Sequence, residues 1–333
     1  MRNNSWFKEK ILLGMDFKEY VSKHATLPFF IAFLILAFSF YSMAYRLLYG
    51  LGPATNLSDT YPWGLWISFD ILAGIALAAP GLTVGTAVYL FGLKDYKKFA
   101  RPAILSSLLG YVFAVFALMF DLGRYYRVPY VIGWSWGLNS ILFLIAPSKI
   151  HPLWYSALLP LFFLISAVFA GISMVIIEST ISHKIFKEYI KEFDEKDFDR
   201  KTIGLAKALV VSLFVYLILK ILDLTHYDNW HYLNTDYGYW YLFEIVGFVM
   251  TPALILINAI KTNNAKVVRV IAFVVAFGVI VNRFNVSLIA YNWYIPLSDK
   301  YYPTWMEVAL SLGVVTLIIL FYRFIVRRMP ILS

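Results

Sequence analysis

Two carboxylates and one guanidinium fall inside apolar stretches of this sequence. Asp70 lies in LWISFDILAG, Glu244 in YWYLFEIVGF and Arg283 in VNRFNVSLIAY. Charged groups within a bilayer are costly, so they face protein or water and commonly pair with one another or handle ions and substrates. A carboxylate and an arginine at membrane depth therefore predict a site that exchanges protons with a bound ligand, with Asp70 as the first candidate.

Three further ionisable residues lie nearer the helix ends. Glu307 occurs in PTWMEVAL, and Asp121 and Arg124 occur in FDLGRYYR. A structural interpretation stays open for several of these groups. In that interpretation Arg283 does no more than neutralise Glu244 or Asp70. Asp121 and Arg124 then form an ion pair at a helix end. We expect no comparable acidic residue in the opposite halves of the spans.

The composition places these residues in a membrane protein. The chain has 333 residues, of which 61% are hydrophobic and only 15% charged, well beyond the apolar fraction of soluble domains. Runs near 20 apolar residues suffice to cross a bilayer as helices. We predict an all-α integral membrane protein with eight transmembrane helices in two four-helix bundles. The expected spans are 27–50, 63–92, 102–120, 152–177, 203–223, 238–260, 267–290 and 303–326.

The basic residues predict the topology. Of the 29 Lys and Arg, 21 fall in the two terminal regions and in the loops 93–101, 178–202 and 261–269. The positive-inside rule therefore places both termini in the cytoplasm. We divide the chain into an interfacial amphipathic segment 1–26, a first bundle 27–177, a charged cytoplasmic loop 178–202 and a second bundle 203–333. The interrupted apolar stretch 128–147 is expected to be re-entrant or interfacial.

Nine of the ten tryptophans fall on the predicted outer side, and only Trp6 lies on the cytoplasmic side. Aromatic belts normally form at both interfaces, so this asymmetry indicates a docking face or an aromatic ligand there. Trp66 and Tyr61 lie just before Asp70 along the chain and are candidates to pack against such a ligand. Asn282, beside Arg283, is a secondary polar candidate.

The residue inventory excludes several redox groups within the chain. Cysteine is absent, so the chain supplies no thiolate for an iron–sulfur cluster. None of the five histidines lies deep in a predicted span, so the paired axial ligands of a membrane haem are missing, and no spacing indicates a metal site. Electrons must then come from a partner protein, with a bilayer-soluble quinone as the other carrier. The net charge of +9 comes mainly from the Lys and Arg that set the membrane topology, so it does not predict nucleic-acid binding.

Several longer motifs occur together in one order, from Tyr49 to the C-terminus. They are GLGPATNLSDTYPWGLWISFD, GIALAAPG, FDLGRYYRVPY, IAPSKIHPLWYSALLPLFFLISAVFAGISMVIIES, RFNVSLIAYN, YYPTWMEVALSLG and RRMPIL. With these motifs the chain resembles the NrfD/PsrC family of membrane subunits, and most closely the HybB-type quinone-reactive subunit of respiratory nickel–iron hydrogenases.

The resemblance implies a site for menaquinone or ubiquinone near the outer face of a prokaryotic cytoplasmic membrane, with Asp70 beside the quinone. It also implies a ferredoxin-like iron–sulfur subunit docked on that face, near Asn56, Trp63 and His151. That partner would connect the chain to a catalytic subunit of the hydrogenase or molybdopterin type, and the chain alone would not be catalytic.

The sequence departs from the family pattern after Ser140. Longer hydrogenase-type members carry about two further spans there, with an acidic residue before them and a histidine-bearing motif after them, whereas this chain continues directly through ILFLIAPSKI. The donor to the second quinone oxygen is therefore not identified. Two other functions stay open, a proton-conducting or transport subunit and a structural anchor without a quinone site.

Overall fold

The computed structural model describes residues 26–123, 149–186 and 194–332, together with single positions before residue 26. Within these residues eight helices are long and apolar enough to cross a membrane, which confirms the all-α membrane fold. They are Leu27–Tyr49, Trp66–Leu90, Lys94–Asp121, Leu159–Ile185, Glu195–His226, Asp236–Lys261, Ala265–Ile289 and Trp305–Val326.

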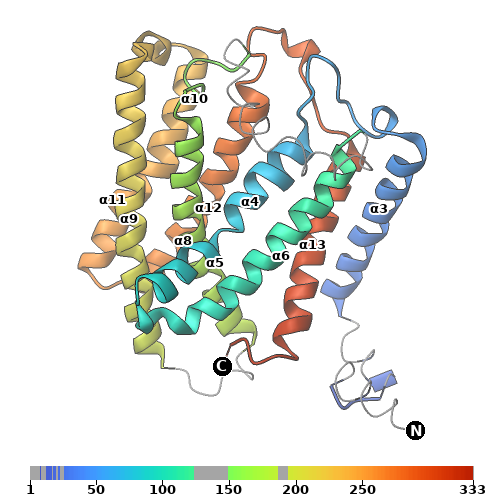
Figure 1. The fold of residues 1–333 in the computed structure, drawn as a ribbon, viewed down its shortest axis with the longest axis vertical. Helices are drawn as coiled ribbons and strands as arrows, with labels where there is room; N and C mark the ends of the chain where they lie inside the picture. The colour runs from blue at the N-terminus through green and yellow to red at the C-terminus, as the bar shows by residue number, and fades with distance from the viewer. Residues whose placement is uncertain are drawn as a thin grey trace.

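Several spans contain more than one helical element (Figure 1). The α-helices are α3 (Leu27–Tyr49), α4 (Gly74–Leu77), α5 (Pro80–Gly85), α6 (Lys97–Asp121), α8 (Leu159–Ile185), α9 (Glu195–His226), α10 (Asp236–Ile245), α11 (Thr251–Lys261), α12 (Ala265–Phe284) and α13 (Trp305–Val326). The π-helical segments are η2 (Trp66–Ala73), η3 (Thr86–Leu90), η8 (Val246–Met250) and η9 (Asn285–Ile289). Short 3₁₀ turns are η1 (Gly52–Ala54), η4 (Lys94–Tyr96), η7 (Asn229–Asn234) and η10 (Leu297–Asp299).

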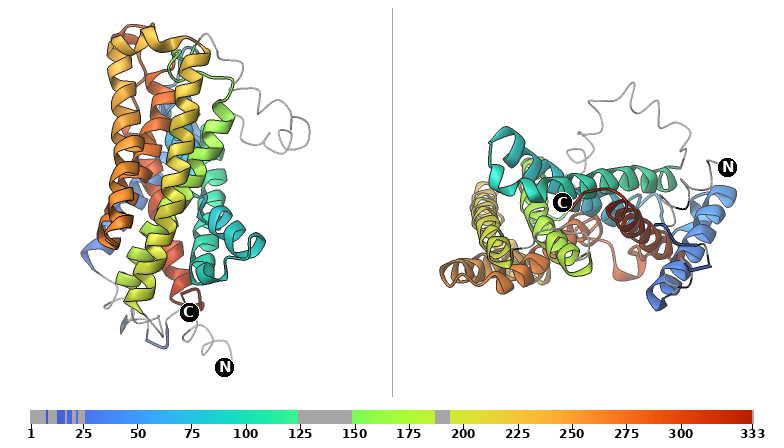
Figure 2. Two further views of the ribbon diagram at one scale, coloured as in Figure 1. Left: turned by 90° about the vertical axis from the view of Figure 1, so that its left-hand side faces the viewer. Right: turned by 90° about the horizontal axis from the view of Figure 1, so that it is seen from below.

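Helix α3 begins and α13 ends at the same end of the molecule, at the bottom of Figure 1. The connections from η3 to α6 and from α11 to α12 reach that end as well, and so do the last turn of α8 and the first turn of α9 (Figures 1 and 2). We call it the basic end, because these are the connections rich in Lys and Arg, and we call the other the aromatic end. The alternation of the eight spans agrees with the charge pattern.

The helices pack in two groups, and the groups do not follow chain order. We place α3, the η2–η3 span, α6 and α13 in a first group and α8, α9, the α10–α11 span and α12 in a second. Helix α8 also packs against α4, α5 and α6, and so joins the two groups. The last helix, α13, returns to pack on the first, α3, so helices far apart in the sequence are neighbours in the fold. Ser39 of α3 touches α13 at Gly313, where a Cβ would collide with the serine side chain. Helix α3 consequently lies at the edge of the molecule, beside α13 (Figure 2).

Two span boundaries differ from expectation. Helix α8 continues to Ile185 and α9 begins at Glu195, so most of the predicted loop 178–202 is helical in the residues that the structure describes. The α9 start is stabilised by Asp194, whose side chain accepts a hydrogen bond from the Lys196 amide at 2.9 Å. The predicted segment 128–147 and most of the segment 1–26 lie outside the described residues.

Candidate functional site

Asp70 lies in the π-helical segment η2, in the interior of the first group. Helix α4, which follows η2, ends with Ala78 at its C-cap. Pro80 comes two residues later and has no amide hydrogen with which to continue the helical hydrogen bonds. The amide of Gly81 donates instead to Ser107 Oγ of α6 at 2.6 Å. Short π-helical segments recur at functional sites, since they displace side chains from regular α-helical positions. The Asp70 side chain is 5% exposed.

The Asp70 carboxylate accepts one hydrogen bond in the described part of the chain. Ser311 Oγ of α13 donates to Asp70 Oδ2 at 2.8 Å. Trp66, one turn before Asp70, is buried and donates from Nε1 to the backbone carbonyl of Glu307 at 3.1 Å. These two bonds fasten η2 to α13. Because a carboxylate has about four acceptor positions, most of the hydrogen-bonding capacity of Asp70 is unused by these residues.

Glu307 is fully buried, and its carboxylate is occupied by protein donors. The Thr304 amide donates to Oε2 at 2.9 Å, in a capping box at the start of α13, and the Asn56 amide donates to the same oxygen at 3.4 Å. The Tyr301 hydroxyl donates to Oε1. Burial and this bond raise the pKa of Tyr301. Glu307 therefore fastens two loops of the aromatic end to α13, with both carboxylate oxygens accepting from protein donors.

Asp121 ends α6 close to Asp70, and it interacts electrostatically with both Asp70 and Glu307. Its Oδ1 is buried without a hydrogen-bond partner among the described residues. Arg124, the predicted ion-pair partner, lies outside those residues. Buried polar atoms are nearly always bonded, so this oxygen indicates a place for a group that the described residues do not supply.

Arg46 is the buried cation of this region, and the sequence analysis missed it. From α3 it donates from Nε to the Phe120 carbonyl at 2.7 Å and from Nη2 to the Leu122 carbonyl at 2.8 Å, and it lies within electrostatic range of Asp121. The available signal was an arginine in the last turn of an apolar span, in MAYRLLYG. We call Asp70, Asp121, Glu307 and Arg46 the carboxylate cluster.

Arg283 and Glu244 belong to a separate polar network in the second group. Glu244 accepts from Trp154 Nε1 at 2.8 Å, Asn282 Nδ2 at 2.6 Å and Asn285 Nδ2 at 2.5 Å. Arg283 donates to Asn282 Oδ1 at 2.6 Å and lies 4.0 Å from the ring centre of Phe163.

The structure therefore does not bring Arg283 to Asp70 as expected. Arg283 forms no ion pair with Asp70 or Glu244 in the described residues, and Asn282 stands between it and Glu244. Its second guanidinium nitrogen donates to Ser166 Oγ of α8 at 2.6 Å. The network thus joins α8, α10 and α12 inside the second group.

Further ionisable side chains lie between the helices where none was expected; Glu178 is half-buried. Glu178 of α8, toward the basic end, accepts a hydrogen bond from the Tyr322 hydroxyl at 2.7 Å. The expectation that the basic-end halves of the spans lack acidic residues is therefore wrong, because α8 continues past the predicted boundary at 177. Lys220 and Asp223 of α9 are buried, and Asp223 accepts from Ser156 Oγ at 2.5 Å.

The residues predicted to meet a partner protein differ in exposure. Asn56 is exposed and donates from Nδ2 to the Tyr302 carbonyl at 2.9 Å, and Trp63 is half-buried against Tyr291. Tyr61, predicted as a ligand contact, is buried, and its hydroxyl donates to backbone carbonyls at 3.4 Å. Burial raises the pKa of Tyr61.

His151 is 2% exposed in an aromatic cage at the aromatic end. Its ring stacks on Tyr237, with the ring centres 4.8 Å apart, and meets Trp293 edge-on at the same separation. Burial lowers the pKa of the ring to about 4. In this structure His151 fixes the loop that carries it, so the ring itself is not presented for docking.

Fold and site together define a multi-pass helical membrane protein with a buried carboxylate cluster near one end. The family model described as "Polysulphide reductase, NrfD" matches residues 140–294. A protein of Nitratidesulfovibrio vulgaris is 37% identical over 90% of this chain and 92% of its own length. The chain belongs to the NrfD family.

Two further relatives carry informative names. The "Probable Ni/Fe-hydrogenase 2 b-type cytochrome subunit" of Escherichia coli is 28% identical, over 86% of this chain and 88% of its own length. The "Menaquinone reductase, integral membrane subunit" of Nitratidesulfovibrio vulgaris is 24% identical, over 86% and 87% respectively.

The name b-type cytochrome raises the question of haem, and the described histidines do not fit one. His183 lies in the last turn of α8 at the basic end and His226 in the last turn of α9 at the aromatic end, while His151 and His231 lie outside the spans. A haem held between membrane helices by two histidines needs both of them on facing helices at one depth. No two of these four residues meet that requirement.

Proposed function

We propose that this chain is the membrane anchor of a respiratory oxidoreductase complex and that it binds a quinone or quinol at the carboxylate cluster. The observation that carries the proposal is the unused bonding capacity of two carboxyl groups between helices of the first group, that of buried Asp70 and that of half-buried Asp121, whose Oδ1 is buried. The names of the hydrogenase and menaquinone reductase relatives support the same function.

In the proposed mechanism the chain positions the quinone ring and manages its protons, while the redox chemistry belongs to the carriers. Asp70 exchanges a proton with a ring oxygen, and Ser311 orients the Asp70 carboxyl group. Arg46 offsets negative charge in the cluster. A general acid or base must lie within hydrogen-bond reach of the oxygen that it serves, and Asp70 is assigned the transfer because it is buried with most of its acceptor positions unused by the described residues.

We assign the aromatic end as the docking face for an iron–sulfur subunit that exchanges electrons with the quinone. Exposed aromatic side chains there, including Trp230, Trp240 and Trp305, support this assignment, since aromatic residues are enriched in protein interfaces. The catalytic subunit would be of the hydrogenase or molybdopterin type. The positive-inside rule makes the basic end cytoplasmic and the docking face periplasmic in a prokaryotic membrane.

The test is quinone-linked turnover of the purified complex carrying Asp70→Asn, with an artificial dye as the alternative electron carrier. We expect quinone turnover to fall by about two orders of magnitude, the usual contribution of a positioned acid–base group, while dye turnover is retained. Asp59→Asn, an exposed change in the neighbouring loop, is the matched control. Unchanged quinone turnover in Asp70→Asn would make the residue structural and the site assignment wrong.

A further inference from the structure

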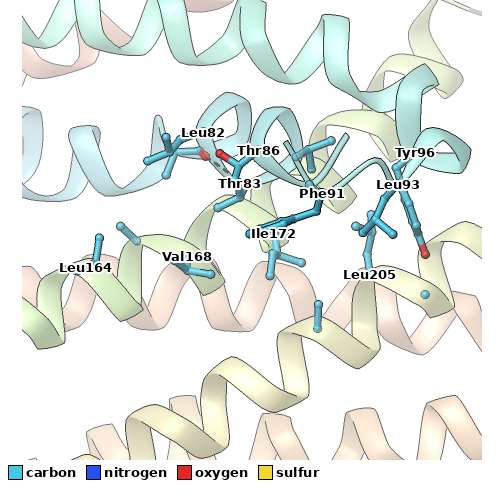
Figure 3. A pocket seen from close by; sticks show the side chains of 16 residues that line it. Leu82, Thr83, Thr86, Phe91, Leu93, Tyr96, Leu164, Val168, Ile172 and Leu205 are labelled. Atoms are coloured by element: carbon cyan, nitrogen blue, oxygen red, sulfur yellow. Dashed lines mark hydrogen bonds between the residues drawn. The ribbon is translucent and has the colours of Figure 1, made fainter. Parts of the chain in front are cut away.

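A groove of about 460 Å³ opens between three spans, away from the carboxylate cluster. One wall comes from the chain around α5 and η3, and the others come from α8 and α9. Figure 3 shows Leu82, Thr86 and Phe91 on one side and Leu164, Val168 and Ile172 on the other. None of the described residues that line the groove is charged.

The groove is open to the surroundings at membrane depth. Leu82, Phe91 and Val168 on its walls are 59%, 72% and 37% exposed. Its floor on α9 is formed by small residues, Gly204 and Ala208, which lie one turn apart on the same helix face. An apolar hollow facing hydrocarbon favours a hydrocarbon chain over water, because water there would lose its hydrogen bonds.

One end of the groove is polar and basic. Tyr96 closes it with its hydroxyl against Gly204, where a Cβ would collide with that oxygen. Lys94 and Lys97 flank Tyr96 on one side, and both are exposed. Arg200 lies one turn before Gly204, on the same face of α9, within electrostatic range of Tyr96.

Two acids share this rim, and the cations outnumber them. Asp197 accepts from Arg200 Nη2 at 2.8 Å and also pairs with Lys201, and Asp95 interacts with Arg200. Lys98 adds another exposed cation next to Lys97. A guanidinium has five N–H donors, so Arg200 keeps donors for a second anion.

We propose that this groove is a binding site for a phospholipid with an anionic headgroup, taken from the leaflet at the basic end. One acyl chain lies along Val168 and Ala208, and the phosphate lies at the rim, against Lys97 and Arg200. Basic residues at the headgroup level attract anionic lipids, and the apolar groove beside them holds the chain at the matching depth. The inference does not depend on the proposed quinone function.

The first test fills the groove. Ala208 is exposed in the groove, so the ring of Ala208→Phe enters the groove without displacing core residues. The matched control is Val211→Phe, on the outer face of the same helix. Native mass spectrometry of the delipidated full chain, titrated with phosphatidylglycerol, should show binding about tenfold weaker for Ala208→Phe only, through loss of buried hydrocarbon contact. Equal binding by both variants would overturn the proposal.

The second test removes the charges. Lys97→Gln with Arg200→Gln should weaken phosphatidylglycerol binding about fivefold per charge, and should weaken phosphatidylcholine binding less, because the choline group offsets the charge of its phosphate. Lys261→Gln with Lys266→Gln, exposed at the same end, is the control and should change neither. Wild-type binding of both lipids with equal affinity, or recovery of a quinone rather than a phospholipid from the groove, would refute an anionic lipid site.

Discussion

Asp70 and Glu307 come from neighbouring helices at the aromatic end, and both are almost fully buried, yet their carboxyl groups are bonded differently. Glu307 accepts three hydrogen bonds from loop residues, whereas Asp70 accepts one, from Ser311. A saturated carboxyl group stabilises structure, and an unsaturated one can meet a ligand. This difference in bonding, rather than burial, selects Asp70 as the proton-exchanging group.

Ser311 should act as a positioning residue. In Ser311→Ala the Asp70 carboxyl loses its only described hydrogen bond, and we expect kcat/KM for quinone to fall about tenfold, as for the loss of a bond to a charged group. Ser311→Thr should restore most of the activity, because the hydroxyl returns. Thr316→Ala is the control and should behave like wild type. Thr316 lies on the same helix, and its hydroxyl donates to the Leu312 carbonyl one turn earlier. Failure of the threonine variant to rescue would contradict the positioning role.

At the scale of the element, α13 connects the parts of the site. Its first turn is capped by Thr304 and Glu307, its next turn carries Ser311, and its middle touches α3 at Gly313. The capping box also ties the loop around Asn56 to α13. The first turn of α13 therefore determines the position of Ser311 along the helix relative to Asp70. It also fixes the loop around Asn56, which forms part of the proposed docking face.

Breaking the Glu307 cap should loosen this end of the molecule. In the native chain one Glu307 oxygen accepts from the Tyr301 hydroxyl and the other from the Thr304 amide. In Glu307→Gln only one oxygen remains and the other position carries an NH₂ donor, so the side chain cannot accept both bonds. We expect a loss of about 1–3 kcal/mol, observed as a lower melting temperature in detergent. Tyr301→Phe removes the bond to Glu307 and also the bond that its hydroxyl accepts from the Leu65 amide at 2.9 Å, so we expect the two changes together to cost less than the sum of their separate effects. Glu195→Gln, exposed in the first turn of α9, is the control, and full additivity of the two changes would refute a shared bond.

At the scale of the whole molecule, two polar networks lie side by side across the group boundary. Ser287 Oγ of η9 donates to Ser68 Oγ of η2 at 2.7 Å, and Phe69 meets Phe284, with ring centres 6.3 Å apart. At the aromatic end the Tyr61 hydroxyl donates to the backbone carbonyls of Tyr291 and Asn292 at 3.4 Å, and the Asn292 side chain donates to the Thr60 carbonyl. The loops there thus hold both groups at a fixed spacing.

The His151 cage predicts a dependence of stability on pH. The folded chain keeps this ring neutral down to a pKa of about 4, whereas an unfolded histidine binds a proton near pH 6.5. Stability from this group is therefore complete above pH 6.5 and is lost as the pH falls toward 4, by roughly 2 kcal/mol at pH 5. The fall in melting temperature from pH 7 to pH 5 should be smaller in His151→Phe than in wild type. His231→Phe is the control, and equal falls in all three proteins would contradict the prediction.

The sequence alone determined the eight spans, their alternation and the burial of Asp70, because hydropathy and loop charge are local properties that a bilayer reads directly. It did not determine the partners of the buried charges. Ser311 meets Asp70 from 241 positions away, and Arg46 meets the end of α6 from 74 positions away. Glu178 was missed because polar side chains satisfied within the bundle let α8 continue past its most apolar stretch. Only the return of α13 to α3 decided which helices enclose the cluster, since helix packing depends on side-chain shape across the whole fold.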